Sequence, residues 1–528
     1  MQKSMFRLGI DVGGTNTDGV LLDESLHCVA KVKVPTTHDI STGIDGAISA
    51  LLKQSGVSGA QIKHAMLGTT QCTNAIVEKR GLDSVGLIRL ALPSGSAVPP
   101  MCGWSTAWQA LLGEHFYQAH GGYEYNGELI ADINEAEIRR LCQKMQGVVQ
   151  SVAISGVFSP VNGDQERQVG RWVKEELPGV NVSLSHKVGS LGLLERENAT
   201  ILNAALQGTA KRFVQGFCNA LKAHQINAKP YFGQNDGTLM SQEFALKYPI
   251  LTVACGPTNS IRGASHLTRI DNAIVVDVGG TTSDIGALTH GYPRESSVAM
   301  ELGEVRTNFR MPDILALAIG GGTIVELSDD NVTIGPQSVG HELPQKARSF
   351  GGQTLTLTDV ALTLNHMDWQ GANAVQNAGL SQQSATLIYN NMVAAIEEGI
   401  DKMKTSAAKV PVILVGGGSA LMPDHFKGVS YVSRPEHYEV ANAIGVALGE
   451  ISGQLDKIVP IAPSARAQVM ASLEKEAIAM AVEAGACSSG VSIIEKSEIP
   501  LSYLQGNMVH VKIKAAGKIA SSVLSVVV

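Results

Sequence analysis

Two stretches of similar sequence carry the residues whose types and spacing suit chemistry. Ile10-Asp-Val-Gly-Gly-Thr-Asn-Thr-Asp18 recurs in the second half of the chain as Val276-Asp-Val-Gly-Gly-Thr-Thr-Ser-Asp284. Each stretch lies between two apolar runs, which predicts a strand, a tight turn and a second strand. The paired glycines let consecutive N–H groups of such a turn point into a concavity where an anion binds. The repeat therefore predicts two phosphate-binding hairpins.

The side chains of the two turns suit a metal-bound triphosphate. Threonine and serine hydroxyls donate hydrogen bonds to phosphate oxygens. Asp11 and Asp277 end their strands, where a carboxylate holds Mg²⁺ directly or through water, so both are predicted metal ligands and catalytic residues. Asp18 and Asp284 follow seven residues later and are expected in the same cleft. The predicted ATP contacts are Gly13, Gly14, Thr15, Asn16, Thr17, Gly279, Gly280, Thr281 and Thr282.

A single turn of this kind has an ordinary alternative interpretation, in which the aspartate caps a hairpin that binds nothing. Two copies in the same strand–turn–strand setting favour phosphate binding. A third glycine-rich element follows the apolar run 411–415. Its glycines let a nucleoside lie against the backbone, and the N-terminus of the next helix can face that nucleoside. The predicted adenosine contacts are therefore Gly416, Gly417, Gly418 and Ser419.

These motifs require an α/β framework to position them. Strand-like runs at 64–67, 84–90 and 151–158 alternate with helical spacing at 135–145 and 163–176, which predicts mixed sheets covered by helices. A chain of 528 residues exceeds one hydrophobic core, so we expect at least two domains. We place an N-terminal lobe, a second lobe and a small C-terminal α+β region at residues 1–190, 191–460 and 461–528.

Composition excludes several classes of function. The chain has 41 Lys plus Arg against 48 Asp plus Glu, which argues against a nucleic-acid or anionic-membrane partner. No apolar window is long enough for a transmembrane span. The seven cysteines are widely spaced and include no Cys-x-x-Cys pair, which favours a reducing, cytoplasmic location.

In the order hairpin, hairpin, strand-Gly-Gly-Gly, the elements resemble the actin, Hsp70 and sugar-kinase superfamily. Within it, the chain is most similar to a short type of the hydantoinase A/oxoprolinase family. The resemblance spans about residues 5–450, although the Pro-Gly-Pro-Ala-Cys-Tyr-Gly stretch of long members is missing. Further stretches that carry the resemblance are Leu67–Gly81, Glu195–Asn203, Gly256-Pro257, Ile319-Gly-Gly-Gly-Thr323, Ile334–Gly340 and Ala441-Asn-Ala-Ile-Gly445.

The resemblance implies a two-lobed actin-like ATPase fold made of duplicated ribonuclease H-like domains. It also implies an ATP- and Mg²⁺-dependent subunit that phosphorylates a cyclic amide, imide or related carbonyl compound and so activates it for hydrolysis. A second subunit, hydantoinase B-like or unrelated, and an oligomeric assembly are part of the same expectation. The resemblance adds three glycines to the predicted ATP contacts: Gly320, Gly321 and Gly322.

The resemblance also favours a substrate-facing role for two polar stretches. Thr69 and Thr70 open a strand-to-helix passage, for which a simple helix cap is the alternative. The Gln234–Gly237 stretch matches a polar loop near the family's cleft, but on its own it is an ordinary turn signal. We expect Thr69 and Thr70 to be catalytic. The predicted substrate contacts are Asn74, Asp18, Asp284 and Asn235.

Two other functions use the same nucleotide clamps. One is a nucleotide-driven, chaperone-like reactivating factor, whose ATPase activity would respond to a protein. The other is a small-molecule kinase, which would release a stable phosphorylated product. Cys72 and Cys255 are weak candidates for a nucleophile, since no partner base is recognisable in the sequence.

Overall fold

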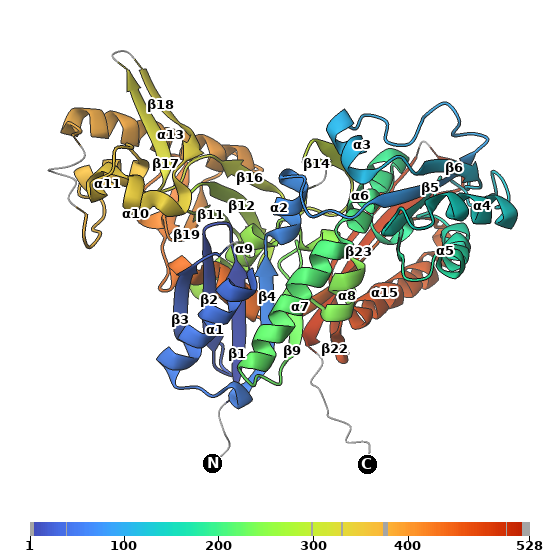
Figure 1. Ribbon diagram of the computed structural model, residues 1–528, viewed down its shortest axis with the longest axis horizontal. Coiled ribbons are helices and arrows are strands. Elements are labelled where there is room, and N and C mark those ends of the chain that lie inside the picture. Colours follow the sequence, from blue (N-terminus) through green and yellow to red (C-terminus); the bar gives the residue numbers. More distant parts are fainter. Residues whose placement is uncertain are drawn as a thin grey trace.

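The computed structural model describes residues 5–37, 40–296, 299–328, 331–372, 379–502 and 504–519. Figure 1 shows three parts along the long axis of the molecule: a six-stranded sheet beside helix α13 (Gln382–Met403), a central nine-stranded sheet, and a four-stranded sheet. Each of the two larger sheets contains one of the predicted hairpins. In the described part of the chain, no helix is long and apolar enough to cross a membrane.

The central sheet is mixed, as predicted. Its strand β1 (Phe6–Val12) pairs antiparallel with β2 (Asn16–Leu22) and parallel with β4 (Ile62–Thr69). Beyond β2 lies β3 (Cys28–Pro35). Beyond β4 the order is β9 (Lys229–Gly233), β10 (Leu239–Ser241), β21 (Glu450–Pro460), β23 (Met508–Ile519) and β22 (Ala486–Pro500).

β1 is buried from Leu8 to Val12 because helices cover both of its faces. Ile10 and Leu51 of α1 (Ile40–Ser55) belong to one buried cluster. On the other face Gly9 meets α14 (Ala441–Ala447), where a Cβ would lie 2.5 Å from the carbonyl oxygen of Ala443. This close approach holds the first hairpin firmly between two helices.

The six-stranded sheet repeats the same arrangement around the second hairpin. β11 (Ala273–Val278) pairs antiparallel with β12 (Ser283–Thr289) and parallel with β19 (Val410–Val415). Helix α13 packs against this sheet through a buried cluster. The remaining strands are β13 (Tyr292–Pro293) and β16 (Ile314–Leu317) beside β12, and β20 (Val429–Ser433) beside β19.

Two helices cross between the two large sheets. α9 (Cys255–Thr268) packs on α14 at two glycines that admit no side chain. A Cβ on Gly263 would lie 1.9 Å from the carbonyl oxygen of Ala441, and one on Gly445 would lie 1.8 Å from that of Asn259. The crossing places polar residues of both helices under the hairpins.

The four-stranded sheet lies within the predicted N-terminal lobe but is separate from the central sheet. Its strands are all parallel in the order β6 (Phe116–His120), β5 (Val85–Leu92), β7 (Ser151–Gly156) and β8 (Asn181–Leu184). Helices α4 (Glu135–Met145) and α5 (Asp164–Glu176) complete its own apolar cluster. Helix α6 (Leu193–Ala205) then leads back to the central sheet through α7 (Gln207–Ala223).

The C-terminal region contains the predicted helix, α15 (Arg466–Glu483), and the two strands β22 and β23. These strands extend the central sheet, because β23 pairs with β21 along its whole length. α15 packs on the same three strands. β22 and β23 therefore share a sheet with β1, although they are far from it in sequence.

Candidate nucleotide-binding site

The two hairpins have the same geometry as well as similar sequences. In the first, Asp11 pairs with Asp18 across the strands, and in the second Asp277 pairs with Asp284. Each turn is closed by one backbone hydrogen bond of the same type. These bonds are Gly13 N–H to Asn16 O (3.0 Å) and Gly279 N–H to Thr282 O (2.8 Å).

The tips of the two turns face each other with unused donors. A Cβ on Gly280 would lie 4.0 Å from the Thr15 Cγ2 methyl, so the two turns approach closely. Among the backbone hydrogen bonds of the described residues, the N–H groups of Gly14, Thr15, Gly280 and Thr281 donate to no acceptor. Four free N–H groups from two lobes therefore border one space, as a phosphate chain requires.

The chain after β3 supports the first turn from behind. The Thr36 hydroxyl donates to the carbonyl oxygen of Gly13 (2.9 Å), and the Thr36 N–H donates to that of Thr15 (3.0 Å). The hydroxyls of Thr36 and Thr17 also share a hydrogen bond of 3.1 Å. Thr17 is thus engaged within the protein, and the turn carbonyls are held away from the phosphate space.

The second turn is supported by the predicted glycine loop 320–322. Gly321 N–H donates to Gly279 O (3.1 Å), and Gly322 N–H donates to Gly280 O (2.7 Å). Gly320 N–H donates to the Thr323 hydroxyl (2.8 Å). All three N–H groups of the loop are therefore engaged within the protein, and the loop holds the turn in place.

The glycine loop 416–418, which is predicted to contact adenosine, lies against the base of the second hairpin. Gly418 N–H donates to Val278 O (2.8 Å). Gly416 has a left-handed backbone (φ 84°), and a Cβ there would lie 2.2 Å from Asp277 Oδ1. Gly417 lies alongside Lys33, and the Ser419 hydroxyl is buried. Glycine at position 416 thus allows the loop and the carboxylate to share the same corner of the cleft.

Asp11 is buried and accepts hydrogen bonds from two amides that were not among the predicted site residues, although the family stretch Ala441–Gly445 includes one of them. Asn259 of α9 donates to Asp11 Oδ1 (3.0 Å). Asn442 of α14 donates to Asp11 Oδ2 (2.9 Å) and to Asp18 Oδ2 (2.8 Å). Burial, followed by the charges of Asp18 and Asp277, raises the pKa of Asp11 to about 7, although the hydrogen bonds from Asn259 and Asn442 lower it.

Among the described residues, the two carboxylates of the second hairpin have fewer hydrogen-bond donors and cations beside them than those of the first. Ser260 of α9 donates to Asp277. Burial raises the pKa of Asp277, and burial with the neighbouring Asp277 charge raises that of Asp284 to about 7. In the first hairpin Lys33 of β3 lies 2.6 Å from Asp18. Lys33 was not among the predicted site residues, yet its charge acts on aspartates of both hairpins.

The arrangement fits a Mg²⁺ ion held mostly by phosphate and water. Among the described residues, no three His, Cys, Asp or Glu side chains converge into a protein-only metal cage. The four hairpin aspartates line one cleft, and a raised carboxylate pKa marks negative charge that a cation would offset. Mg²⁺ prefers one or two carboxylates together with phosphate oxygens and water. Asp11 and Asp277, at the ends of β1 and β11, could hold such an ion.

Thr69, Thr70 and Asn74 lie beside the first hairpin, because β4 is the parallel neighbour of β1. The Thr70 N–H and hydroxyl both donate to Val12 O, at 3.2 and 3.3 Å. The Thr69 hydroxyl is buried and accepts the N–H of Gln71 (3.3 Å). Asn74 is half-buried on α2 (Gln71–Val77), which begins at this edge of the sheet.

Gly68 is expected to be intolerant of even one added methyl group. A Cβ there would lie 2.0 Å from Asp11 Oδ1 and 2.5 Å from Asn259 Nδ2. Gly68→Ala should lower the free energy of unfolding by about 1–3 kcal/mol, since the crowded carboxylate must move. Chemical denaturation measures this loss. The matched Gly46→Ala change in α1, where a Cβ meets nothing within 4 Å, should instead stabilise by about 0.5–1 kcal/mol. Equal effects would refute the crowding argument.

The Gln234–Gly237 turn joins β9 to β10 and is buried. The Asn235 amide donates to the carbonyl oxygen of Arg310 (2.7 Å). Its neighbour Asp236 accepts hydrogen bonds from Thr238 and Ser452, both at 2.6 Å. Despite burial, the charges of Arg310 and Lys514, followed by these hydrogen bonds, hold the pKa of Asp236 well below its usual range. Asn235 thus links this turn of the central sheet to the loop that contains Arg310.

The two cysteines near the cleft have the wrong environment for a nucleophile. Burial raises the pKa of the Cys72 thiol to about 12 and also raises that of Cys255. The Cys255 thiol donates to the carbonyl oxygen of Thr69 (3.3 Å). Both side chains are therefore uncharged packing groups at neutral pH.

Protein-family models match both hairpin regions. The model described as hydantoinase/oxoprolinase N-terminal region matches residues 7–177. The model described as hydantoinase/oxoprolinase matches residues 196–371. The chain belongs to the hydantoinase/oxoprolinase family. The predicted family membership is confirmed.

Curated relatives within and near this family are distant in sequence. Caprolactamase subunit alpha of Pseudomonas jessenii is 28% identical over 413 residues, which cover 73% of this chain and 58% of the relative. The acetone carboxylase beta subunit of Xanthobacter autotrophicus is 22% identical, over 68% of this chain and 54% of the relative. The chain thus spans little more than half the length of these relatives.

Two solved structures share the fold of this family member. The ATP-dependent caprolactamase from Pseudomonas jessenii has a TM-score of 0.79 at 20% identity, over 97% of this chain and 87% of that chain. A nucleotide-free acetone carboxylase has a TM-score of 0.69 at 18% identity, over 98% and 88%. These likenesses confirm the predicted two-lobed, actin-like α/β fold.

The family stretch Glu195–Asn203 contributes to the core of the four-stranded part, away from the hairpins. Arg89 on β5 forms a bidentate pair with Glu197, with N–O distances of 2.7 and 2.6 Å. The Trp104 indole donates to Asn198 Oδ1 (2.7 Å). Both side chains of the Arg89–Glu197 pair are about 1% exposed. This part of the family pattern therefore reflects a buried ion pair.

Proposed function

We propose that this chain is an ATP-dependent subunit that phosphorylates a cyclic amide, imide or related carbonyl compound and so activates it for hydrolysis. The observation that carries the proposal is the pair of facing turns of identical register, with their four free N–H groups. Family membership supports the choice of substrate class, since relatives carry the names caprolactamase and 5-oxoprolinase. Mg²⁺ would neutralise the phosphates and align the terminal one for transfer.

The protein's own contribution is positioning and charge. The N–H groups of Gly14 and Thr15 would bind phosphate from the central lobe, and those of Gly280 and Thr281 from the other lobe. Asp11 and Asp277 would orient the metal, and Asn259 and Asn442 would fix the Asp11 carboxylate. Preorganised groups of this kind cost no rearrangement during transfer, which is how phosphoryl transfer is usually accelerated.

We also propose that a second subunit completes the reaction. Several relatives are named as subunits: caprolactamase subunit alpha, acetone carboxylase beta subunit and acetophenone carboxylase gamma subunit. The proposed chemistry has two stages, activation of a carbonyl oxygen and attack on the activated carbon. The residues described above serve only the first stage. The chain alone is then expected to consume ATP without completing net amide hydrolysis.

A substrate panel tests the proposed activity. ATP turnover by the purified chain would be measured with Mg²⁺ and a series of lactams, hydantoins and cyclic imides. An open-chain amide would be measured beside each cyclic compound as a control. Stimulation by a subset of the cyclic compounds would support the proposal. Stimulation by a protein alone would indicate a reactivating factor, and a stable phosphorylated product would indicate a kinase. Either result would replace the proposed function.

The raised carboxylate pKa values predict how pH affects stability and metal binding. Aspartates ionise near pH 4 in an unfolded chain, but Asp11 and Asp284 have pKa values of about 7 in the fold. Between these values the folded protein binds more protons than the unfolded chain. The free energy of unfolding should therefore fall as pH rises from about 4 to about 7 and change little above that.

Mg²⁺–nucleotide binding should show the opposite trend, because ionised carboxylates bind the cation. We expect the affinity for Mg²⁺–ADP to be about tenfold higher at pH 8 than at pH 6 by isothermal titration calorimetry. Asp284→Asn serves as the control, since it removes one titrating group and should flatten the profile. Two results would contradict the prediction. One is a wild-type affinity that is the same at pH 6 and pH 8, and the other is an Asp284→Asn variant whose affinity differs from the wild type by the same factor at both pH values.

A further inference from the structure

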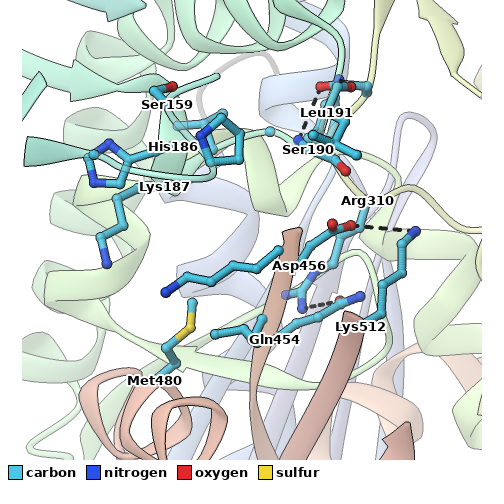
Figure 2. Close-up of a pocket in the computed structure, with 18 of the residues that line it drawn as sticks. Ser159, His186, Lys187, Ser190, Leu191, Arg310, Gln454, Asp456, Met480 and Lys512 are labelled. Carbon is cyan, nitrogen blue, oxygen red and sulfur yellow. Dashed lines mark hydrogen bonds and ion pairs between the residues drawn. The ribbon is translucent and has the colours of Figure 1, made fainter. Parts of the chain in front are cut away.

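A large cavity lies where the four-stranded part, the C-terminal strands and a loop of the second lobe meet. Its volume is about 580 Å³, which is typical of small-molecule sites. Figure 2 shows side chains entering it from segments far apart in sequence, including His186, Arg310, Asp456 and Met480. None of the described residues that line it belongs to the two glycine turns. The cavity is therefore separate from the phosphate space.

Part of the lining, which we call the apolar wall, consists of apolar side chains. Leucine, phenylalanine and methionine side chains from six different segments contribute to it. These are Leu191, Phe244, Leu251, Phe309, Leu455 and Met480. A hydrocarbon group buried here would gain roughly 25 cal/mol per Å² of covered surface.

Most of the cations around the cavity already have protein partners. Lys457 binds both carboxylate oxygens of Glu476, at 2.6 and 2.8 Å. Lys512 lies 3.5 Å from Asp456, which also accepts a hydrogen bond from His510. Their charge is thus largely satisfied inside the protein.

Arg310 is also held within the protein at the base of the cavity. It donates to Gln454 (3.0 Å) and to Gln234, and it lies 3.5 Å from Asp236. Figure 2 shows the contact between Arg310 and Gln454. A ligand would have to compete with these partners, so Arg310 is not the residue that selects an anion.

Lys187 is the exception among these cations. It ends the short turn η2 (Ser185–Lys187) and extends into the cavity on the side of α15, as Figure 2 shows. Within the described part of the chain, no carboxylate lies within 4.0 Å of its ammonium group. The residue as a whole is exposed, but the surrounding cavity partly removes the ammonium group from water and lowers the pKa of Lys187. Glu483 and Glu476 partly oppose this shift, and Lys457 adds to it. An anion beside this ammonium would relieve the imbalance.

The lining has a formal net charge of +1, which one negative charge on a ligand would balance, because four carboxylates stand against five cations: Arg167, Lys187, Arg310, Lys457 and Lys512. Four carboxylates line the same cavity: Glu195, Glu295, Asp456 and Glu476. They would repel a dianion such as phosphate, and the cavity offers no glycine turn of the kind that cradles phosphate in the other cleft. A carboxylate on a hydrocarbon body satisfies both the lone ammonium and the apolar wall.

We propose that this cavity is a binding site for a small organic monocarboxylate, with Lys187 binding the carboxylate and the apolar wall covering the hydrocarbon chain. The site requires no nucleotide, so it stands independently of the proposed ATP-dependent activity. It also differs from the predicted substrate contacts, none of which lines the cavity.

Binding of hexanoate to the full-length chain without nucleotide tests the proposal. Isothermal titration calorimetry would compare hexanoate with the uncharged hexanamide and with inorganic phosphate. The wild type should bind hexanoate saturably and at least about tenfold more tightly than either of the other two probes. Lys187→Met should weaken hexanoate binding at least about tenfold, whereas Lys174→Met on the exposed side of α5 should leave it unchanged.

Thermal unfolding of both variants shows whether they remain folded, and unchanged midpoints are expected because both lysines are exposed. Three results would overturn the proposal: no saturable hexanoate binding up to about 10 mM, equal affinity for hexanamide, or equal hexanoate affinity in Lys187→Met. Loss of ATP turnover with intact hexanoate binding would instead concern only the nucleotide cleft.

Discussion

Asp277→Asn is expected to lower ATP turnover by at least about 100-fold, which corresponds to about 2.7 kcal/mol of lost transition-state stabilisation. The change removes one charge and keeps the shape of the side chain. The Ser260 hydroxyl can still donate to the remaining side-chain oxygen, so the fold should stay intact. The loss arises because the metal is no longer held at the end of β11.

The measurement is steady-state ATP hydrolysis with the cyclic amide that stimulates the wild type most. Asp401→Asn provides the control, because Asp401 is exposed on α13 and far in the chain from both hairpins. Equal thermal unfolding midpoints for the two variants would show that stability does not explain the loss. Full turnover by Asp277→Asn would remove Asp277 from the proposed metal site.

Arg89→Met is expected to cause the largest loss of stability among the changes considered. Arg89 and Glu197 are both almost completely buried and are joined by two hydrogen bonds. Removing one partner leaves a buried, unpaired group, which typically costs about 3–5 kcal/mol. Urea denaturation measures this as a lower free energy of unfolding.

The comparison is Lys402→Met, which breaks the exposed Lys402–Glu398 pair on α13. Exposed pairs contribute little, so its unfolding midpoint should barely change. If Arg89→Met were no more destabilising than Lys402→Met, the buried pair would not be the reason for the charged residues in Glu195–Asn203.

The two hairpins could be predicted from sequence because a strand, a double-glycine turn and a second strand are local features. Their identical register follows from the spacing between Asp11 and Asp18, which Asp277 and Asp284 repeat. The function of the turns stays a prediction, but their facing positions agree with it. The glycines at 320–322 were assigned to the nucleotide through the family resemblance, whereas their N–H groups hold the second turn.

The surroundings of the carboxylates could not be predicted in the same way. Asn259 and Asn442 lie on two crossing helices, and Lys33 lies on the third strand, so their convergence on Asp11 and Asp18 depends on tertiary packing. The glycines Gly263 and Gly445 allow those helices to approach closely, and single glycines in a helix carry little signal.

The C-terminal region shows the same limit. Its helix and strands were predictable from local pattern, but nothing local indicates that β23 pairs with β21 and extends the central sheet. That pairing forms part of the cavity around Lys187, since β21 and β23 both contribute to its lining. The cavity is built from segments that are far apart in sequence, and the sequence analysis therefore did not identify it.

The most direct test of the account is a crystal structure of the chain with Mg²⁺ and a non-hydrolysable ATP analogue. The account predicts the phosphate chain between the two turns, with its oxygens within hydrogen-bonding distance of the N–H groups of Gly14, Thr15, Gly280 and Thr281. It also predicts the metal beside Asp11 and Asp277. A nucleotide bound elsewhere, or phosphates that contact only one of the two turns, would contradict it.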